Sequence, residues 1–321
     1  MYTIKEASVR SGVGIPLLRA WERRYGVVTP ARTSSGYRLY DEASIERLRA
    51  MRQLIADGWS AQQAAEQVRE SSLEELAVLA RPIVPAAGEQ GAPSSEGRAV
   101  VPDVAEALVA RLLVAARTLD AADLEATLDE TFGTARFEVA IERVVMPALR
   151  AIGDAWERGE VTIAGEHAAS HAILRRLAMA YEAAADGGWS NPVLVGLGPG
   201  ARHELGALAF AVSARRAGLP VLYLGPDLPA SSWTAAAIGR DARAAVVGVP
   251  TRKDANGATE IFTALREAKP AIVLAVGGDE AARVAAAHDA LVLPDSPQAA
   301  VRALRSQLGL GDPRPLRVDK P

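Results

Sequence analysis

The sequence predicts a protein in three parts: two helical parts, followed by an α/β part with a five-stranded parallel sheet. Three observations carry this prediction. A stretch rich in Pro, Gly, Ala and Ser, without periodicity, divides the chain as a linker does. Apolar residues recur at helical spacing on both sides of it. After Gly187-Gly188, five short apolar runs alternate with Ala-rich amphipathic stretches, which is typical of a doubly wound parallel sheet.

The predicted boundaries follow these changes of pattern. For a chain of 321 residues, roughly 150 residues per domain gives two or three domains. We assign residues 1–79 to the first part, 80–103 to the linker, 104–187 to the second part, 188–310 to the third part and 311–321 to a tail.

The composition excludes several classes of protein. Hydrophobic residues make up 49% and charged residues 23% of the chain, as in an ordinary globular protein. The absence of cysteine excludes disulfide scaffolds, thiolate zinc sites, iron–sulfur clusters and cysteine nucleophiles. No apolar run is long enough for a transmembrane helix, and the N-terminus lacks a signal-peptide core. We therefore expect a cytoplasmic protein that does not contact a membrane. Any imidazole chemistry must use His167, His171, His203 or His288.

The first part begins as a helix–turn–helix. Thr3 can cap a first helix, and Glu6 completes a capping box three residues on. Gly12 ends that helix, and a second begins near Ile15-Pro16, with proline at an early helical position. The hairpin-like stretch TPARTSSGYRLYD follows, and Asp41 opens the next helix.

The charge of this part favours nucleic acid as a partner. Residues 1–60 contain ten basic and six acidic residues, a net charge of +4, whereas the whole chain has a net charge of −3. The second helix carries Arg19, Arg23 and Arg24. The planar fork of arginine grips phosphate or guanine bidentately. Each of these arginines could instead be a solvated surface residue or an internal partner.

The motifs of the first 70 residues agree with a known family in order and spacing. The run YTIKEASVRSGV, then LRAWERRYG, then GYRLYDEASIERL resembles MerR-type regulators, in which the hairpin is the wing of a winged helix–turn–helix. The resemblance implies binding to a double-stranded DNA operator as a dimer. It also implies DNA contacts by three residues of the second helix and three of the wing: Arg19, Arg23, Arg24, Arg32, Tyr37 and Arg38.

The third part contains a candidate ligand site. His203 and Gly206 form an HxxG motif directly after the first apolar run, at the carboxyl end of the first strand. Open α/β sheets bind ligands at that edge. The fourth strand ends in Gly277-Gly278, where the absence of side chains lets a ligand approach the backbone.

HxxG after the first strand and two glycines after the fourth resemble the cobalamin-binding domain of B12-dependent proteins, a Rossmann-like (flavodoxin-like) fold. The resemblance implies that His203 coordinates cobalt from below and that Gly206, Gly277 and Gly278 line the cofactor. Two positions depart from the family's pattern. Ala201 stands where the family has an acidic residue that orients the histidine, and Gly248 stands where it has a serine.

The second part adds a further motif. Trp156 is followed, after nine residues, by Glu166-His167. This spacing resembles the four-helix bundle cap of the CarH/LitR group of B12-dependent photoreceptor regulators. In that group the three residues lie at the upper face of adenosylcobalamin, which the resemblance implies for this chain too. One departure concerns the residue after the tryptophan, here Glu157, where light-sensing members have a histidine.

Other interpretations of these residues remain open. Trp156 could be a core residue, and Glu166 could stabilise the start of a helix. His167 and His171 share a helix face at a spacing that can bind zinc, although no HExxH motif accompanies them.

The sequence therefore predicts a DNA-binding transcriptional regulator, not an enzyme. It would hold adenosylcobalamin between cap and Rossmann-like domain and would sense light or cobalamin. A change of oligomeric state, as a homodimer or homotetramer, would control operator binding. The alternative is the same architecture without cobalamin, controlled by another ligand, another chromophore or a protein partner. Ala201 and Glu157 favour this alternative.

Overall fold

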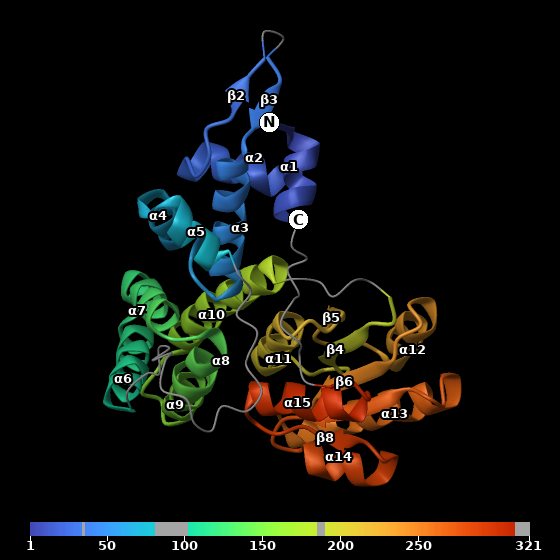
Figure 1. Cartoon of the computed structure of the whole chain (residues 1–321). Coiled ribbons are helices and arrows are strands. Elements are labelled where there is room, and N and C mark those ends of the chain that lie inside the picture. Colours follow the sequence, from blue (N-terminus) through green and yellow to red (C-terminus); the bar gives the residue numbers. More distant parts are fainter. Residues whose placement is uncertain (34–35, 81–101, 185–189, 312–321) are drawn as a thin grey trace, which may run out of the picture. The chain divides into compact units, whose positions relative to one another are not determined.

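The computed structural model describes residues 1–33, 36–80, 102–184 and 190–311. The chain forms two compact units, one comprising Met1–Ile83 with Glu182–Ala184 and the other comprising the rest (Figure 1). Most of the predicted linker 80–103, the Gly187-Gly188 break and most of the tail 311–321 lie outside the described residues.

The first unit is a winged helix–turn–helix followed by further helices, as predicted. A three-stranded antiparallel sheet of order β1-β3-β2 accompanies the helices. The elements in chain order are β1 (Tyr2–Thr3), α1 (Ile4–Ser11), α2 (Ile15–Tyr25), β2 (Ala31–Arg32), β3 (Arg38–Tyr40), α3 (Glu42–Ala56), α4 (Ala61–Glu70) and α5 (Leu73–Leu79).

Local signals account for the helix ends of this unit. The Thr3–Glu6 capping box is present at the start of α1, and Gly12 ends the helix with a φ of 68°. Asp41 caps α3 by accepting a hydrogen bond from the backbone of Ser44. Strand β1 was not predicted, because a strand of two residues is too short to carry a periodic pattern. It forms by pairing with β3, which places Tyr2 opposite Tyr40.

The second unit begins with a helical bundle. Its helices are α6 (Pro102–Thr118), α7 (Ala121–Thr134), α8 (Phe137–Ala140), the π-helical turn η1 (Ile141–Val145), α9 (Met146–Glu157) and α10 (Ile163–Ala183). Because α8, η1 and α9 follow one another without a break, the bundle has four helical rods, as predicted. Helix α6 begins at Pro102, inside the range assigned to the linker.

The rest of the second unit is the predicted five-stranded parallel sheet. Its order is β5-β4-β6-β7-β8, and every pairing is parallel. This is the flavodoxin-like order, and its switch point lies between β4 and β6. The strands are β4 (Val193–Leu197), β5 (Val221–Gly225), β6 (Ala244–Gly248), β7 (Val273–Gly277) and β8 (Leu291–Val292). The helices are α11 (Leu205–Arg216), α12 (Ala230–Gly239), the 3-10 turn η2 (Arg252–Asp254), α13 (Ala255–Ala268), α14 (Ala281–His288) and α15 (Pro297–Gln307).

The helices cover both faces of this sheet. Helices α12, α13 and α14 pack side by side on one face, whereas α11 and α15 pack together on the other (Figure 1). A buried cluster around Trp233 and Phe262 joins the first set to the central strands. Because the residues within the strands are buried in this cluster, polar side chains are found at the ends of the strands, and the carboxyl ends of β4 and β6 form the edge at the switch point.

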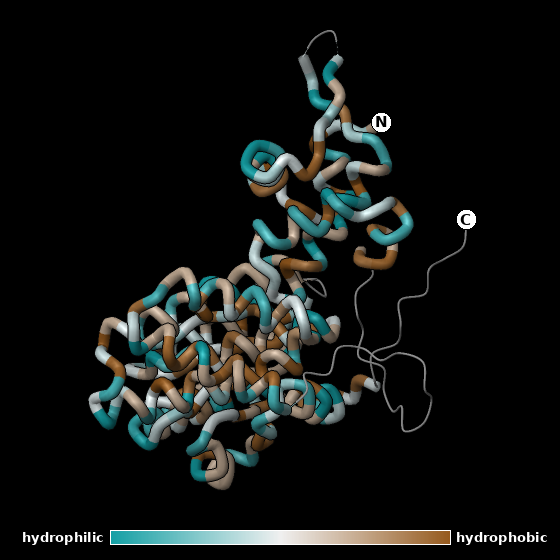
Figure 2. The backbone as a smooth tube through the Cα atoms, turned by 90° about the vertical axis from the view of Figure 1, so that its left-hand side faces the viewer, coloured by the Kyte–Doolittle hydropathy of each residue, from teal (hydrophilic) through white to brown (hydrophobic). Residues whose placement is uncertain are grey.

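No helix in the described part of the chain is long and apolar enough to cross a membrane. Hydrophilic residues interrupt the hydrophobic ones along the helices (Figure 2). This alternation is what helices with one buried face require.

Candidate functional site

The predicted DNA-contacting arginines of α2 are accessible. Arg19, Arg23 and Arg24 are all exposed. Arg19 and Arg23 are four residues apart and so lie on one face of the helix. The Arg24 guanidinium lies 5.9 Å from the Tyr25 ring centroid. The helix can therefore present cations to phosphates or to base edges.

The wing residues divide into two kinds. Arg32 is exposed, and Tyr37 is 73% exposed. Arg38 is only part-exposed, since its Nε lies 3.0 Å from a carboxylate oxygen of Glu22 on α2. The hydroxyl of Tyr40 donates to the same carboxylate. Burial, and next the charge of Glu22, raise the pKa of Tyr40 to about 12, so the phenol stays a donor at neutral pH.

Several other basic residues of this unit serve its own fold. Arg47 donates to the Val68 carbonyl, and Arg49 donates to the Arg10 carbonyl and to Glu46. The net charge of +4 therefore overstates the positive charge available to DNA. The sequence could not separate these arginines from those of α2, because helical spacing does not show which neighbour each one meets.

His203 lies where a ligand of the sheet would sit. It follows β4 at the switch point of the sheet, and its side chain is exposed. No hydrogen bond or ion pair engages its imidazole among the described residues. Ala201, where the family has a carboxylate, is 1% exposed. The imidazole is thus available as a metal ligand, without a carboxylate at the expected place.

The glycines near this edge differ in whether the chain's own packing requires a residue without a side chain. Gly278 has a φ of +106°, and a Cβ built on it would lie 2.6 Å from the Val249 carbonyl oxygen. The chain's own packing therefore requires glycine there. A Cβ on Gly277 would make only ordinary contact with Leu293, at 3.8 Å. At Gly248, a Cβ would lie 3.3 Å from Leu197 Cγ, so a serine there would crowd that leucine.

The three predicted residues of the cap are accessible. Trp156, in the last turn of α9, is 46% exposed, which contradicts the interpretation of a core tryptophan. Glu166 accepts a hydrogen bond of 2.5 Å from the Ser170 hydroxyl. The side chain of His167 is 64% exposed, and its Nε2 lies 3.5 Å from Glu166 Oε2. His171 lies one turn on, with the two imidazole centroids 6.2 Å apart.

The bundle and the sheet meet beside the HxxG motif. A Cβ built on Gly206 would lie 3.9 Å from Met146 Cε, at the start of α9. Trp156 is ten residues farther along the same helix, about 15 Å at 1.5 Å per residue. At the other end of α11, Arg216 forms a part-buried ion pair of 2.8 Å with Glu138 of α8. Helix α11, which begins just after His203, therefore lies against α8 and α9 of the bundle.

Residues of β5 and the loop after it hold the HxxG loop. The Tyr223 hydroxyl donates to Glu204 at 2.6 Å, and the Gly200 amide donates to Asp227 Oδ1 at 2.7 Å. Burial, and next the Glu204 carboxylate, raise the pKa of Tyr223. Sequence reasoning missed the Tyr223–Glu204 pair, since 19 residues separate the two. Asp227 lies in the segment LGPDLP, whose sequence by itself does not mark the bond to the Gly200 amide.

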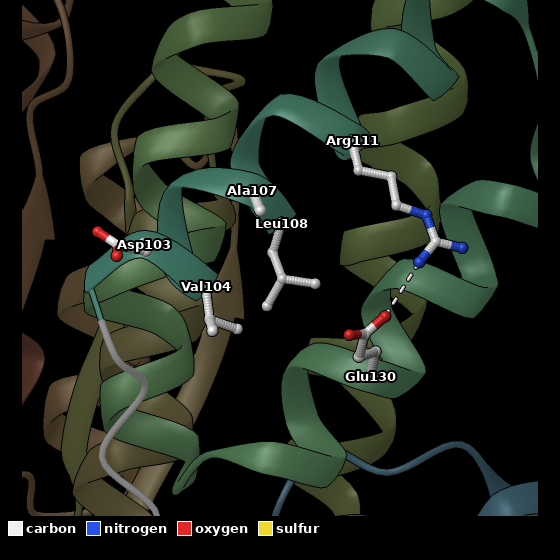
Figure 3. Close-up of a pocket in the computed structure, with 6 residues that line it drawn as sticks. All are labelled: Asp103, Val104, Ala107, Leu108, Arg111 and Glu130. Atoms are coloured by element: carbon white, nitrogen blue, oxygen red, sulfur yellow. Dashed lines mark hydrogen bonds and ion pairs between the residues drawn. The ribbon is translucent and has the colours of Figure 1, made fainter.

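A groove of about 390 Å³ lies elsewhere, along α6 and α7 (Figure 3). Its floor is apolar, and at one side Arg111 donates to Glu130 at 3.0 Å. None of the sequence-predicted site residues lines it. The six residues that do are Asp103, Val104, Ala107, Leu108, Arg111 and Glu130.

The donor set fits a corrinoid better than a free metal ion. No three His, Asp or Glu side chains of the described ranges are grouped so as to hold a metal. A cobalt ion held in a corrin ring would need few ligands from the protein, and the exposed imidazole of His203 could be one of them. At Gly206, a Cβ would meet only Met146 Cε, at an ordinary contact distance of 3.9 Å, so the chain's own packing does not require glycine there.

Comparison with known proteins agrees with both halves of this picture. The family profile for MerR HTH family regulatory proteins matches residues 2–70, and that for the B12 binding domain matches residues 108–181. The HTH-type transcriptional repressor CarH of Myxococcus xanthus is 31% identical over 277 residues, 84% of this chain and 85% of CarH. The repressor CarA of the same organism is 28% identical over 278 residues, 86% of this chain and 85% of CarA.

A solved structure shares the fold of the second unit. The monomethylamine corrinoid protein of Methanosarcina barkeri matches with a TM-score of 0.54 and 12% identity, over 63% of this chain and 99% of its own. This likeness concerns the fold alone. The sequence relatives are transcriptional repressors rather than enzymes. The chain belongs to the family of MerR-type transcriptional regulators with a B12 binding domain that includes CarH.

Proposed function

We propose that this regulator senses light through adenosylcobalamin held between bundle and sheet, and that an oligomer change controls its hold on the operator. The observation that carries the proposal is the exposed imidazole of His203 at the switch point of the sheet. Gly206 of the same motif lies beside Met146 at the start of α9, and that helix carries exposed Trp156 in its last turn.

Each residue has a role in this proposal. His203 would bind the cobalt, and Gly206, Gly277 and Gly278 would lie beside the ring. Trp156 would shield the group that carries the cobalt–carbon bond with its large apolar surface, together with Glu166 and His167. When bound, the cofactor supplies a cobalt–carbon bond that visible light breaks.

The chain's own residues convert that event into a change of DNA affinity. Trp156 would then have no group to shield, and the packing of α8 and α9 against α11, including the Arg216–Glu138 ion pair, would be free to change. The cofactor shifts the protein between two states only by its different affinity for them. In the dark, two dimers would assemble into a tetramer whose paired DNA-binding units gain avidity. Light would loosen this assembly without altering a DNA-contacting residue.

An absorption spectrum tests the proposal. Purified protein mixed with adenosylcobalamin in the dark should retain a corrinoid through gel filtration, and green light should change both its spectrum and its elution volume. His203→Ala should shift the dark spectrum to that of cobalamin without a protein histidine. A protein that retains no corrinoid would overturn the proposal.

A second candidate is the same regulator controlled by another ligand. Buried Ala201 favours it, because loss of a carboxylate that orients a metal-bound histidine weakens metal sites roughly 10–100-fold. Glu157, in place of the family's histidine after the tryptophan, also favours it. Retention of adenosylcobalamin with a spectrum unaltered by light would select cobalamin sensing over light sensing, and absence of retention would select this candidate.

A further inference from the structure

We infer that Tyr223 and Glu204 position His203 for its ligand, in place of the carboxylate missing at Ala201, and that Tyr181 joins this pair to the cap helix α10. The inference rests on the proposed cobalamin site. It assigns no direct cofactor contact to any of the three residues.

The need for another positioning device follows from the loop's sequence. A metal-bound imidazole is ordinarily oriented by a partner on its other nitrogen. Ala201 is buried and has no polar side-chain atom. Among the described residues, no side chain bonds to the imidazole of His203 directly. What the chain can still fix is the position of the backbone that carries the imidazole.

That backbone is held on both sides of His203. On the C-terminal side, the Tyr223 hydroxyl donates to Glu204 at 2.6 Å. On the N-terminal side, Asp227 accepts from the Gly200 amide at 2.7 Å, and its own amide donates to the Ala201 carbonyl at 3.1 Å. Asp227 adopts a φ of +57° to make both bonds. The hydrogen bonds on both sides come from residues of β5 or of the loop after it, so the placement of His203 depends on that strand.

Strand β5 is in turn held by the cap. It is an edge strand, so its outer backbone groups have no neighbouring strand. The Tyr181 hydroxyl donates to the Val221 carbonyl at 3.0 Å and accepts from the Tyr223 amide at 2.9 Å. Arg215 stacks on the Tyr181 ring, 3.6 Å from its centroid, and donates to the Tyr181 carbonyl at 2.9 Å.

These contacts form a path from one part of the proposed site to another. Helix α10 carries Glu166 and His167 in its first turns and Tyr181 near its end. Tyr181 bonds to the backbone of Tyr223, and Tyr223 bonds to Glu204, the neighbour of His203. A rotation or slide of α10 would therefore act on the loop of the lower ligand through hydrogen bonds that now close at 2.6–3.0 Å. Edge protection alone would explain Tyr181 but not the bond from Tyr223 to Glu204.

The test uses the full-length protein and adenosylcobalamin in the dark. Tyr223→Phe and Glu204→Ala should each weaken cobalamin binding roughly tenfold and move part of the bound spectrum toward that of His203→Ala. Glu204→Gln keeps a carbonyl oxygen that can accept from Tyr223, and should stay within about twofold of wild type in affinity. In the cofactor-free protein, Tyr223→Phe should also speed hydrogen exchange of the amides at 200–206.

A matched control is available in the first unit. The Tyr2 hydroxyl donates to Glu42 at 2.7 Å, the same kind of bond, and Tyr2→Phe should leave the cobalamin spectrum and affinity unchanged. Circular dichroism of each variant verifies folding. If Tyr223→Phe does not fold, the comparison of Glu204→Ala with Glu204→Gln tests the inference. Cobalamin affinity of Glu204→Ala equal to that of wild type would contradict it.

The outcomes separate this inference from the proposed function. If wild type retains no corrinoid, both are wrong. If wild type binds and His203→Ala alters the spectrum, but Tyr223→Phe and Glu204→Ala match wild type, only the positioning role is overturned. Weaker binding that Glu204→Gln restores supports positioning by the hydrogen bond rather than by the charge of Glu204.

Discussion

Arg38 of the wing is bound to Glu22 of α2, with its Nε 3.0 Å from one carboxylate oxygen and 3.1 Å from the other. The pair joins the two elements that the family resemblance assigns to DNA contact. It also explains why α2 carries an acidic residue, although the expected partner of this helix, DNA, is itself negatively charged. Glu22 therefore holds Arg38 and Tyr40 in place relative to α2.

This pairing predicts the effect of Glu22→Gln on DNA binding. Charge alone would predict tighter binding, since a negative charge is removed beside DNA. If Glu22 orients the wing, affinity should instead fall roughly fivefold, the equivalent of about 1 kcal/mol for one charge-assisted hydrogen bond. Fluorescence anisotropy with operator DNA at fixed salt measures it. Glu70→Gln, an exposed carboxylate of α4, is the control; a gain of affinity by Glu22→Gln alone would contradict the orienting role.

The exposed arginines of α2 predict a salt dependence. Each phosphate contact contributes about 0.9 to the slope of log K against log salt. Arg23→Ala should therefore weaken binding and lower that slope by about 1. Arg69→Ala removes the same charge from exposed α4 and should leave the slope unchanged. Equal slopes for Arg23→Ala and wild type would show that Arg23 does not contact phosphate.

The two glycines after β7 predict different outcomes for the same substitution. Gly278→Ala forces a φ near +106° on an alanine and places its Cβ 2.6 Å from the Val249 oxygen, so unfolding free energy should fall by at least about 2 kcal/mol. Gly277→Ala meets only ordinary contacts and should change stability by less than about 0.5 kcal/mol. Urea unfolding of the cofactor-free protein compares them. Loss of cobalamin binding by stable Gly277→Ala would support a cofactor beside Gly277.

The cap of α3 predicts a dependence of stability on pH. Hydrogen bonds from the hydroxyl and then the amide of Ser44 lower the pKa of Asp41 below its ordinary value of 3.8. The stabilisation is therefore fully present above that ordinary value and is lost as pH falls through the lowered one. Asp41→Ala should cost about 1 kcal/mol at neutral pH, and the difference from wild type should shrink below about pH 4.

A neutral cap provides the comparison for this measurement. Ser60 caps α4 through its hydroxyl, which accepts from the Gln63 amide at 3.2 Å. The cost of Ser60→Ala should not vary with the ionisation of a carboxylate. If the two substitutions show the same dependence on pH in urea unfolding, the assignment of the titration to Asp41 is wrong.

Much of the architecture follows from local sequence signals. Capping residues such as Thr3 and Asp41, and Gly12 with its positive φ, act within one helical turn, so a sequence pattern contains them completely. The apolar runs predict parallel strands because the runs of the central strands β4, β6 and β7 are buried on both faces of the sheet. The family motifs likewise lie in short segments, which is why the DNA-binding unit and the B12-binding architecture could be predicted.

The contacts that orient functional side chains could not be predicted in this way. Glu22 meets Arg38 across 16 residues, and Tyr223 meets Glu204 across 19. Neither pair has a period or a spacing that marks it. Only packing decides which arginine is turned inward, which glycine the backbone itself requires and which carboxylate lies near the loop of His203. The reason is physical: residue types and local spacing specify the elements, whereas partners distant in the chain are chosen when those elements close on one another.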